Sequence, residues 1–440
     1  MGGRTTVISD LHLHSKYSRG CSTDLDIVNL EKYARIKGLD LLGTGDFTHP
    51  KWIQEIKTSL VEDENAPGIF RTKSGFPFLL QTEISLIYSS NGKGRRIHNV
   101  VLAPNLDVVD QITQYLLKFG RVDYDGRPIF KIPCPEFTES LMKIDKNIEI
   151  IPAHIWTPHF SLFGDYNQFN TAEECFEDQT KNIHALETGM SSDPQMNWRV
   201  SCLDRFNLVS FSDSHSFWPW RIGREATTFE LKQFDYRNII EALRVKKEEY
   251  SDAKNRIQMT IEVDPGYGKY HLDGHRSCNV CMTPSETIKA KGICPKCGRK
   301  VTIGVENRVE QLADRADGFR PKGANDFMKL IPLAEIISAL LGKGIATKGV
   351  TEEYYKLIKA FGTENNILLN ADFDSLSRIT NEKLAKAVID NRNGLIKIIP
   401  GYDGEYGYPV FGKNQMPAET TKKESKTVIP KKVQKGLDEF

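Results

Sequence analysis

Seven short apolar stretches in the first half of the chain each end in, or carry, a side chain that can bind a metal ion. They are rich in Ile, Val and Leu and are short enough to be buried strands. Helix-like stretches lie between several of them, for example residues 26–38. Strands that alternate with helices and carry chemistry at their ends are typical of a (β/α) barrel. We therefore expect an α/β fold, and seven units rather than eight indicate a distorted barrel.

The candidate metal ligands recur at the ends of these stretches. His12 and His14 are two residues apart, so in a strand their imidazoles project to the same side. Six of the ten histidines lie at such positions, whereas ordinary core or surface histidines would be scattered. Imidazole with carboxylate suits zinc, manganese or iron, and shared carboxylates favour more than one ion. The candidates are His12, His14, Asp46, His49, Glu83, His98, His154, Asp213 and His215, and the remaining stretch ends in Glu187.

Four cysteines lie close together in the second half of the chain. They form two C-x2-C pairs separated by twelve residues, which is typical of a structural zinc site. A redox pair is the alternative, and two evenly matched pairs argue against it. Since four thiolates fill the coordination, we expect His271 and His275 to be surface or DNA-facing residues. The expected zinc ligands are Cys278, Cys281, Cys294 and Cys297, whereas Cys21, Cys134, Cys175 and Cys202 stand alone as reduced thiols.

The length of 440 residues predicts several domains. We expect a barrel over residues 1–255, a zinc module over 256–302, a helical domain over 303–412 and a disordered, lysine-rich tail over 413–440. The net charge of +1 neither indicates nor excludes a nucleic acid partner. No apolar stretch reaches the ~20 residues of a membrane span, and the N-terminus lacks a signal peptide's apolar stretch, so we expect a cytoplasmic protein. Nothing in the sequence requires a dimer, so we expect a monomer.

Aromatic and arginine side chains gather in two loops that directly follow metal-binding stretches. This combination stacks an unpaired base and holds its phosphates, although the rings could instead pack the loops against the barrel. The candidate DNA-binding residues are Trp156, Phe160, Phe163, Tyr166, Trp218, Trp220, Arg221 and Arg224.

The end of the chain carries Gln434, Leu437 and Phe440, spaced as Q-x-x-L-x-x-F. In one helical turn Leu437 and Phe440 would share a face and could enter an apolar pocket. The spacing resembles the peptide that docks onto sliding clamps of the PCNA type, so such a clamp is a candidate partner.

The segments SDLHLHS, TGDFTHP, TEIS, IHNVVLAP, PAHIW and FSDSH together resemble the PHP (polymerase and histidinol phosphatase) superfamily over roughly residues 5–225. This resemblance implies a distorted seven-stranded barrel with a trinuclear metal site for phosphoester hydrolysis. It implies two ions that share a carboxylate, the first bound by His12, His14, Glu83 and Asp213 and the second by Glu83, His98 and His154.

The expected third ion departs from the family pattern. His215 would belong to it, and two histidines that many members have are absent here. Asp46 and His49 are therefore assigned in their place. We expect Asp213, Glu83 and His215 to be the catalytic residues.

A barrel, a four-cysteine module and a helical domain, in that order, resemble the endonuclease Q family over nearly the whole chain. The loop PAHIWTPHFSLFG and the segment GYDGEYGYPVF are part of the match. The resemblance implies a prokaryotic DNA repair endonuclease that hydrolyses the phosphodiester 5′ to hypoxanthine, uracil, xanthine and abasic sites. The damaged nucleotide would be flipped out, from double- or single-stranded DNA. Zn²⁺ is expected in the cysteine module and in the barrel, with Mg²⁺ or Mn²⁺ as alternatives in the catalytic site.

Two other functions stay open. A phosphomonoesterase of the histidinol-phosphatase type explains the barrel but leaves the second half of the chain without a purpose. A DNA-binding scaffold with a degenerate barrel agrees with the altered third site but not with the near-complete ligand set.

Overall fold

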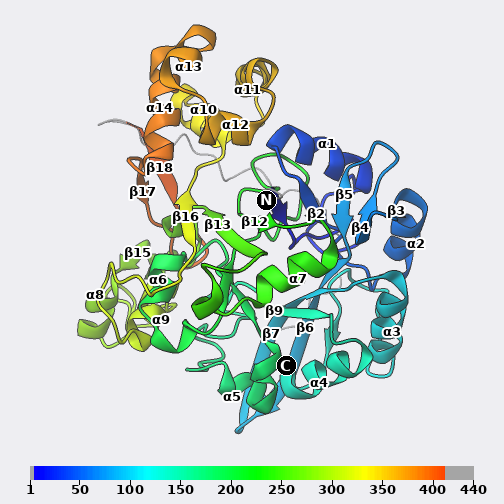
Figure 1. The fold of residues 1–440 in the computed structure, drawn as a ribbon. Helices are drawn as coiled ribbons and strands as arrows, with labels where there is room; N and C mark the ends of the chain where they lie inside the picture. Colours follow the sequence, from blue (N-terminus) through cyan, green and yellow to red (C-terminus); the bar gives the residue numbers. More distant parts are fainter. Residues whose placement is uncertain (1–3, 412–440) are drawn as a thin grey trace, which may run out of the picture.

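The computed structural model describes residues 4–411, so Gln434, Leu437 and Phe440 lie outside the described residues. A mixed sheet of eight strands organises the chain (Figure 1). In hydrogen-bonded order its strands are β16 (Asp326–Lys329), β13 (Arg256–Glu262), β12 (Ala226–Leu231), β1 (Thr5–Asp10), β2 (Leu41–Gly43), β5 (Pro77–Leu79), β4 (Ala66–Arg71) and β3 (Val61–Asp63).

A second sheet continues the chain from the end of β5. Its strands, in order, are β8 (Ile129–Phe130), β6 (Gln81–Ser90), β7 (Lys93–Leu102) and β9 (Glu149–Pro152). A parallel pair, β10 (Ala185–Glu187) and β11 (Asn207–Val209), follows. Backbone hydrogen bonds join the strand ends: Ile155 N donates to Glu187 O (3.0 Å), and His14 N donates to Ser214 O (3.2 Å). The ends of the strands therefore surround a common centre.

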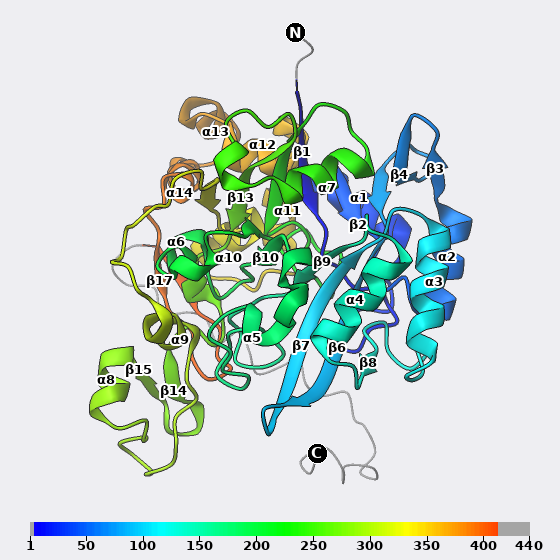
Figure 2. The same ribbon diagram turned by 60° about the horizontal axis from the view of Figure 1, so that its bottom comes forward.

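Each of the seven predicted stretches contains a strand, but the strands differ from a single (β/α) barrel. They belong to three hydrogen-bonded sheets, and β7 pairs antiparallel with both β6 and β9. The antiparallel pairing of β6 with β7 is caused by a tight turn at Asn91 and Gly92, which have φ angles of 53° and 71°. An Asn-Gly pair of this kind makes a two-residue hairpin, so β6 and β7 run as one long ribbon with no helix between them. Figure 2 shows this ribbon projecting from the body of the molecule.

Helices cover the outside of the sheets and are bounded by local caps. Asp26 accepts a hydrogen bond from Asn29 N at the start of α1, and Gly38 ends this helix with a φ of 90°. The helices of the first part are α1 (Ile27–Lys37), α2 (Pro50–Ser59), α3 (Leu106–Leu117), α4 (Cys134–Ile144), α5 (Glu173–Phe176), α6 (Pro194–Trp198) and α7 (Tyr236–Arg244).

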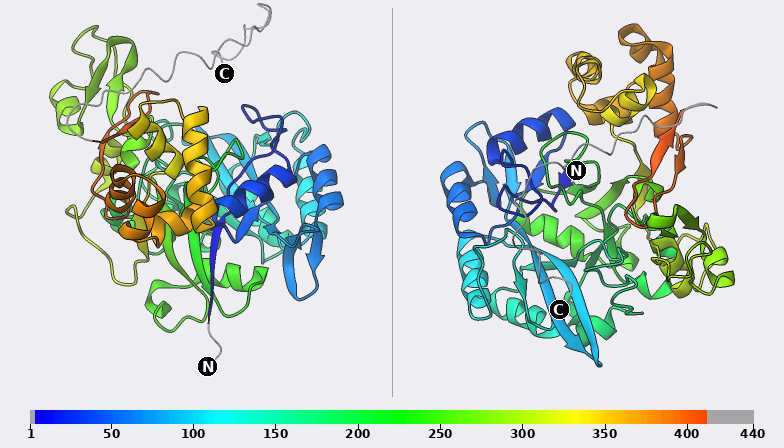
Figure 3. Two further views of the ribbon diagram at one scale, coloured as in Figure 1. Left: turned by 90° about the horizontal axis from the view of Figure 1, so that it is seen from above. Right: turned by 180° about the vertical axis from the view of Figure 1, so that it is seen from behind.

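The second half of the described chain contains further α-helices and two short hairpins. Its last helices, α10 to α14, are called the later helices and form a group that stands against α1 at one end of the molecule (Figure 3). The helices are α8 (Pro284–Lys289), α9 (Val305–Leu312), α10 (Leu333–Leu341), α11 (Lys348–Phe361), α12 (Glu364–Leu369), α13 (Phe373–Ile379) and α14 (Glu382–Arg392), of which α10 to α14 form the group. The hairpins are β14 (Asp273–His275) with β15 (Val280–Met282), and β17 (Lys397–Ile399) with β18 (Tyr408–Val410).

The predicted domain borders do not coincide with the borders of the sheets. β13 follows the predicted border at residue 255, yet it pairs with β12 in the main sheet. β16 lies in the predicted helical domain and pairs with β13. The two strands close the exposed edge of β12, which is the physical reason that the sheet extends across both borders.

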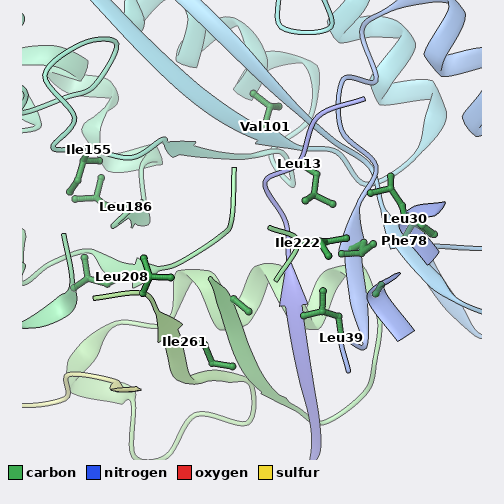
Figure 4. Close-up of a cluster of buried hydrophobic side chains, with 14 of the residues drawn as sticks. Leu13, Leu30, Leu39, Phe78, Val101, Ile155, Leu186, Leu208, Ile222 and Ile261 are labelled. Atoms are coloured by element: carbon green, nitrogen blue, oxygen red, sulfur yellow. The ribbon is translucent and has the colours of Figure 1, made fainter. Parts of the chain in front are cut away.

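One buried apolar cluster runs through the strands and the later helices. It contains Phe78 and Ile261 of the main sheet together with Leu333, Leu357 and Leu384 of α10, α11 and α14. Figure 4 shows part of this cluster between the strands. The later helices are thus held to the sheets by a shared core. Among residues 4–411, no helix is both long enough and apolar enough to cross a membrane.

Candidate metal centre

The ends of the strands deliver ionisable side chains to one buried centre. Three of these residues, Asp46, His154 and Asp213, have left-handed backbone with φ angles of 41°, 31° and 46°. Each comes within a few residues of the end of a strand, β2, β9 or β11. Such backbone costs non-glycine residues of order 1–3 kcal/mol each and concentrates at functional sites. The strain turns each side chain away from its strand and toward the centre.

The first group of candidate ligands comprises His12, His14, Glu83 and Asp213, whose ligand atoms all lie within 4.8 Å of one another. His14 Nε2 is 3.0 Å from Asp213 Oδ1 and 3.3 Å from Glu83 Oε2. His12 Nε2 is 3.5 Å from Glu83 Oε1. These spacings suit two imidazoles and two carboxylates around one cation.

The second group shares Glu83 with the first. His98 Nδ1 lies 2.8 Å from Glu83 Oε1, and His154 Nε2 lies 3.4 Å from the same oxygen. Oε2 of Glu83 faces His14, and Oε1 faces both His12 and the second group, so this carboxylate can bridge two ions.

One buried atom in the centre supports the presence of ions. His12 Nε2 has no hydrogen-bond partner among the described residues, and it faces Glu83 Oε1 at 3.5 Å. Leaving such an atom unsatisfied costs free energy, whereas a cation between the imidazole and the carboxylate would satisfy it. The residues present therefore fit a metal centre with two ions.

Outer carboxylates orient the two histidines of the first group. His12 Nδ1 lies 2.9 Å from Glu187 Oε1, and His14 Nδ1 lies 3.1 Å from Asp46 Oδ1. A carboxylate on one ring nitrogen fixes the other nitrogen as the ligand atom.

The charges of the group support ligand roles. Burial acts to raise the pKa of Glu83, but His98, Arg127 and His12 hold it well below its usual range. Burial also acts against ionised Asp213, and His12 outweighs it and holds the pKa low. Burial lowers the pKa of His98 to about 4, so its imidazole is neutral at pH 7. Ionised carboxylates and neutral imidazoles are the forms that bind cations. Burial acts to lower the pKa of His12 and His14, but the carboxylates around them hold it well above its usual range, so these imidazoles would release a proton when an ion binds.

The predicted third ion is not matched by a third group among the described residues. Asp46 is occupied by hydrogen bonds from Ser15 N (2.6 Å) and Ser18 Oγ (2.8 Å) besides His14. His49 instead precedes α2 and stacks on Tyr17 with ring centres 4.4 Å apart. These hydrogen bonds hold the side chain of Asp46 on the segment that follows His14. Asp46 and His49 therefore do not come together in one ligand group among the described residues, and their assignment to a third ion stays a prediction.

His215 also lies outside both groups, although its ring centre is 4.5 Å from that of His14. Its Nδ1 lies 3.0 Å from the backbone oxygen of Asp213, and about a third of the side chain is exposed. It therefore borders the centre from the solvent side.

A cavity of about 390 Å³ opens beside the centre. Its wall includes His98, His154, Phe160, Asp213, Arg224 and Tyr270. Imidazoles, a carboxylate, a guanidinium and aromatic rings thus share one wall. The cavity can therefore take a ligand with both polar and apolar parts.

The predicted aromatic residues separate into two sets. Trp156 is 1% exposed and donates from Nε1 to Asn197 Oδ1 (2.8 Å), and Phe163 is fully buried, so both belong to the core and not to a DNA-binding surface. Phe160 lines the cavity. Trp218 is 40% exposed and stacks on Trp220 at 5.1 Å. The remaining members are Tyr166 and Arg221, which are exposed, and Arg224, whose Nη2 donates to Ser212 O.

The cysteine module brings together a different set of ligands from the predicted one. His275, Cys278, Cys294 and Cys297 lie within 4.8 Å of one another, and Cys281 is not in this group. Cys281 is the middle residue of β15, whose neighbours on either side point into the small apolar core of the module. Strand alternation turns its thiol to the opposite, exposed face. In this group His275, which was expected at the surface, takes the place of the expected ligand Cys281, and the four-cysteine site stays a prediction.

Two residues of the centre were not predicted from the sequence. Glu187 has the correct position at the end of a strand, and that signal could have identified it. Arg127, which lies 3.1 Å from Glu83, follows no strand, and its role is visible only in three dimensions.

Two curated relatives match this chain. A protein-family model described as the MJ0043 C-terminal domain matches residues 332–395, the segment of α10 to α14. The MJ0043 protein of Methanocaldococcus jannaschii is 35% identical over 294 residues, which are 66% of this chain and 35% of that protein. The chain thus spans about a third of the length of this relative. The YqxK protein of Bacillus subtilis is 27% identical over 420 residues, 91% of this chain and 98% of the relative.

Solved structures match nearly the whole chain. The lesion-specific endonuclease PfuEndoQ from Pyrococcus furiosus has a TM-score of 0.81 and 30% identity, covering 92% of this chain and 95% of that chain. Endonuclease Q in complex with a 27-mer duplex substrate with an abasic lesion at the active site has a TM-score of 0.82 and 30% identity, covering 93% and 97%. The fold and the centre place the chain among the metal-dependent endodeoxyribonucleases. Within this class, it belongs to the endonuclease Q family.

Proposed function

We propose that the protein repairs DNA by hydrolysing the phosphodiester on the 5′ side of a deaminated base or an abasic site. The observation that carries this proposal is the shared wall between the cavity and the metal centre. His98, His154 and Asp213 belong to both. A nucleotide held in the cavity would thus have its phosphate beside the candidate ions.

The size and polarity of the cavity support a flipped nucleotide as its occupant. A volume of about 390 Å³ lies in the range of small-ligand sites. Hypoxanthine, uracil and xanthine carry a carbonyl where the parent base carries an amino group, and Ser212, Arg224 and Tyr270 in the wall carry hydrogen-bond donors of the kind that suits such an oxygen. A base must leave the duplex to reach a pocket of this kind. The related endonuclease Q holds an abasic lesion at its active site in a duplex, which agrees with this mode of binding.

The residues of the centre divide the work of hydrolysis. Glu83 would hold both ions, and Asp213 and His154 would hold one each at the edge of the cavity. When bound, such divalent ions polarise phosphoryl oxygens and lower the pKa of a water molecule. Glu187 and Asp46 keep the rings of His12 and His14 in their ligand orientation. The imidazoles favour Zn²⁺, whereas Mn²⁺ and Mg²⁺ would rely on the carboxylates and on water.

The DNA around the lesion would contact aromatic and basic side chains. Phe160 in the cavity wall and the exposed Trp218, which packs on Trp220, would stack on bases, and the exposed Arg221 would reach a phosphate. The cysteine module would support the duplex beyond the lesion, since Lys296 and its basic neighbours lie on its surface.

The proposal is tested with end-labelled duplexes that carry one hypoxanthine, one uracil, one abasic site or no lesion, incubated with Mn²⁺ or Mg²⁺. We expect a nick immediately 5′ of each lesion, none in undamaged DNA, and a loss of at least 100-fold in rate for Asp213→Asn, because this variant loses a charged ligand. Release of phosphate from small phosphomonoesters without any nick would instead identify a phosphatase. Tight binding of the lesion without a nick, unchanged by the substitution, would identify a DNA-binding scaffold.

A further inference from the structure

An arginine reaches the metal centre from a loop outside the strands. Arg127 lies between α3 and β8, and its Nη1 donates to Glu83 Oε2 at 3.1 Å. Its side chain is 25% exposed, whereas that of Glu83 is fully buried. The guanidinium is thus in contact with the bridging carboxylate on one side and with solvent on the other.

The loop is fixed on both sides of this arginine. Gly126 N donates to Tyr17 O (3.0 Å), and any side chain at Gly126 would collide with Asp46 and Ser18. On the other side, Ser85 N of β6 donates to Pro128 O at 3.1 Å. The backbone is therefore seated against the centre immediately before and after Arg127, so the guanidinium is held in place before any ligand arrives.

The contact with Glu83 uses only part of the guanidinium. An arginine has five N–H donors, and the side-chain hydrogen bond described for Arg127 among residues 4–411 is that to Glu83. Since a quarter of the side chain is exposed, the remaining N–H groups can reach a ligand that arrives from the solvent side.

We propose that Arg127 is a catalytic residue that donates hydrogen bonds to a non-bridging oxygen of the scissile phosphate. In the hydrolysis, a water oxygen forms a bond to phosphorus, the bond to the leaving sugar oxygen breaks, and this oxygen takes up a proton. Negative charge grows on the non-bridging oxygens during the attack, and a fixed guanidinium stabilises it. This role rests on the proposed hydrolysis of a phosphodiester. The Arg127 guanidinium also supplies positive charge near Asp46 and His215, two residues that are not part of a third ligand group among the described residues.

The test compares three variants by single-turnover rate, DNA affinity and metal content. Arg127→Met removes the charge, and Arg127→Lys keeps it but loses the planar fork. Arg121→Met is the matched control, because Arg121 lies in the same loop and pairs with exposed Asp123. We expect Arg127→Met to be about 10²–10³-fold slower with its full complement of ions, as for the loss of one transition-state donor. Arg127→Lys should fall between it and wild type, and Arg121→Met should stay within twofold.

Guanidinium ion separates a catalytic role from a structural one. Added at millimolar concentration, it should restore part of the rate of Arg127→Ala and leave Arg121→Ala unchanged. If Arg127→Met and Arg127→Lys bind fewer ions than wild type, or if guanidinium restores nothing, Arg127 only positions Glu83 and the proposal is overturned. The same variants are assayed on bis(p-nitrophenyl) phosphate. A loss on this diester therefore supports the proposal even where lesion DNA is not cut, which would overturn the proposed substrate alone.

Discussion

At the scale of single residues, the centre depends on side chains that touch no ion themselves. Glu187 is fully buried at the end of β10 and faces His12 Nδ1 at 2.9 Å. Its other oxygen accepts a hydrogen bond from His154 N at 2.7 Å. The Glu187 carboxylate therefore contacts one ligand residue of each group, so that it links the two groups as Glu83 does.

Glu187→Gln tests this link. The amide keeps the size of the side chain but loses the charge that holds His12, so we expect the affinity for metal to fall about 10–100-fold, with a similar loss of nicking rate at limiting metal. Excess metal should restore most of the rate. Glu149→Gln is the matched control. Glu149 is as buried as Glu187, but it pairs with His184 (3.0 Å) and lies at the start of β9, whereas the metal centre lies beyond the end of this strand. Equal losses of metal in both variants would contradict an orienting role.

Most residues of the centre could be predicted because strand ends and metal-binding residue types coincide in the sequence. This holds for His12, His14 and Asp213. The exact partners could not be predicted, since Asp46, which follows a strand end, lies 3.1 Å from His14 Nδ1 and outside both ligand groups. The contact of Arg127 with Glu83 could not be predicted, because its loop reaches Glu83 through contacts with β6, which is distant in the sequence.

At the scale of secondary-structure elements, periodicity located the strands but not their pairing. The apolar stretches became strands because their side chains are buried, yet the Asn-Gly turn at Asn91 and Gly92 made β6 and β7 a hairpin instead of parallel neighbours. The later helices also look independent in sequence. In the structure they are joined to α1 by Lys37, which is 3% exposed in its side chain and lies 2.7 Å from Glu364 at the start of α12.

Lys37→Met tests the junction between α1 and α12. It leaves the buried Glu364 carboxylate without its cation, although Leu333 N and Tyr354 Oη still donate to it. We expect a loss of about 3–5 kcal/mol in the free energy of unfolding, the usual cost of breaking a buried pair. Urea denaturation measures it, and Lys32→Met, at an exposed site of the same helix, should cost less than about 0.5 kcal/mol. Similar stabilities of the two variants would mean that the junction contributes little.

At the scale of the whole molecule, catalysis and support are separated into different cores. The apolar cluster that surrounds the metal centre continues into α10 to α14, so these parts should unfold together. The cysteine module has a small core of its own, formed by Val280, Met282, Cys294 and Val301. So small a core needs a metal ion to hold its shape. Loss of this ion should therefore leave the sheets around the metal centre folded.

Cys294→Ser tests this separation. We expect the purified protein to lose one equivalent of zinc, measured by elemental analysis. We also expect it to hydrolyse bis(p-nitrophenyl) phosphate within about twofold of the wild-type rate, because the ligands of the metal centre are unchanged. Nicking of lesion duplexes should fall at least tenfold through weaker binding, since the module would no longer present its lysines in a fixed array.

Cys281→Ser is the matched control, because Cys281 is exposed and lies outside the group of His275, Cys278, Cys294 and Cys297. It should keep its zinc, whereas His275→Ala should lose it. If Cys281→Ser loses zinc and His275→Ala retains it, the four-cysteine site predicted from the spacing is correct, and β15 must turn its thiol inward when the ion binds. If Cys294→Ser instead loses activity on the small diester as well, the cysteine module also stabilises the sheets around the metal centre, and the two cores are coupled.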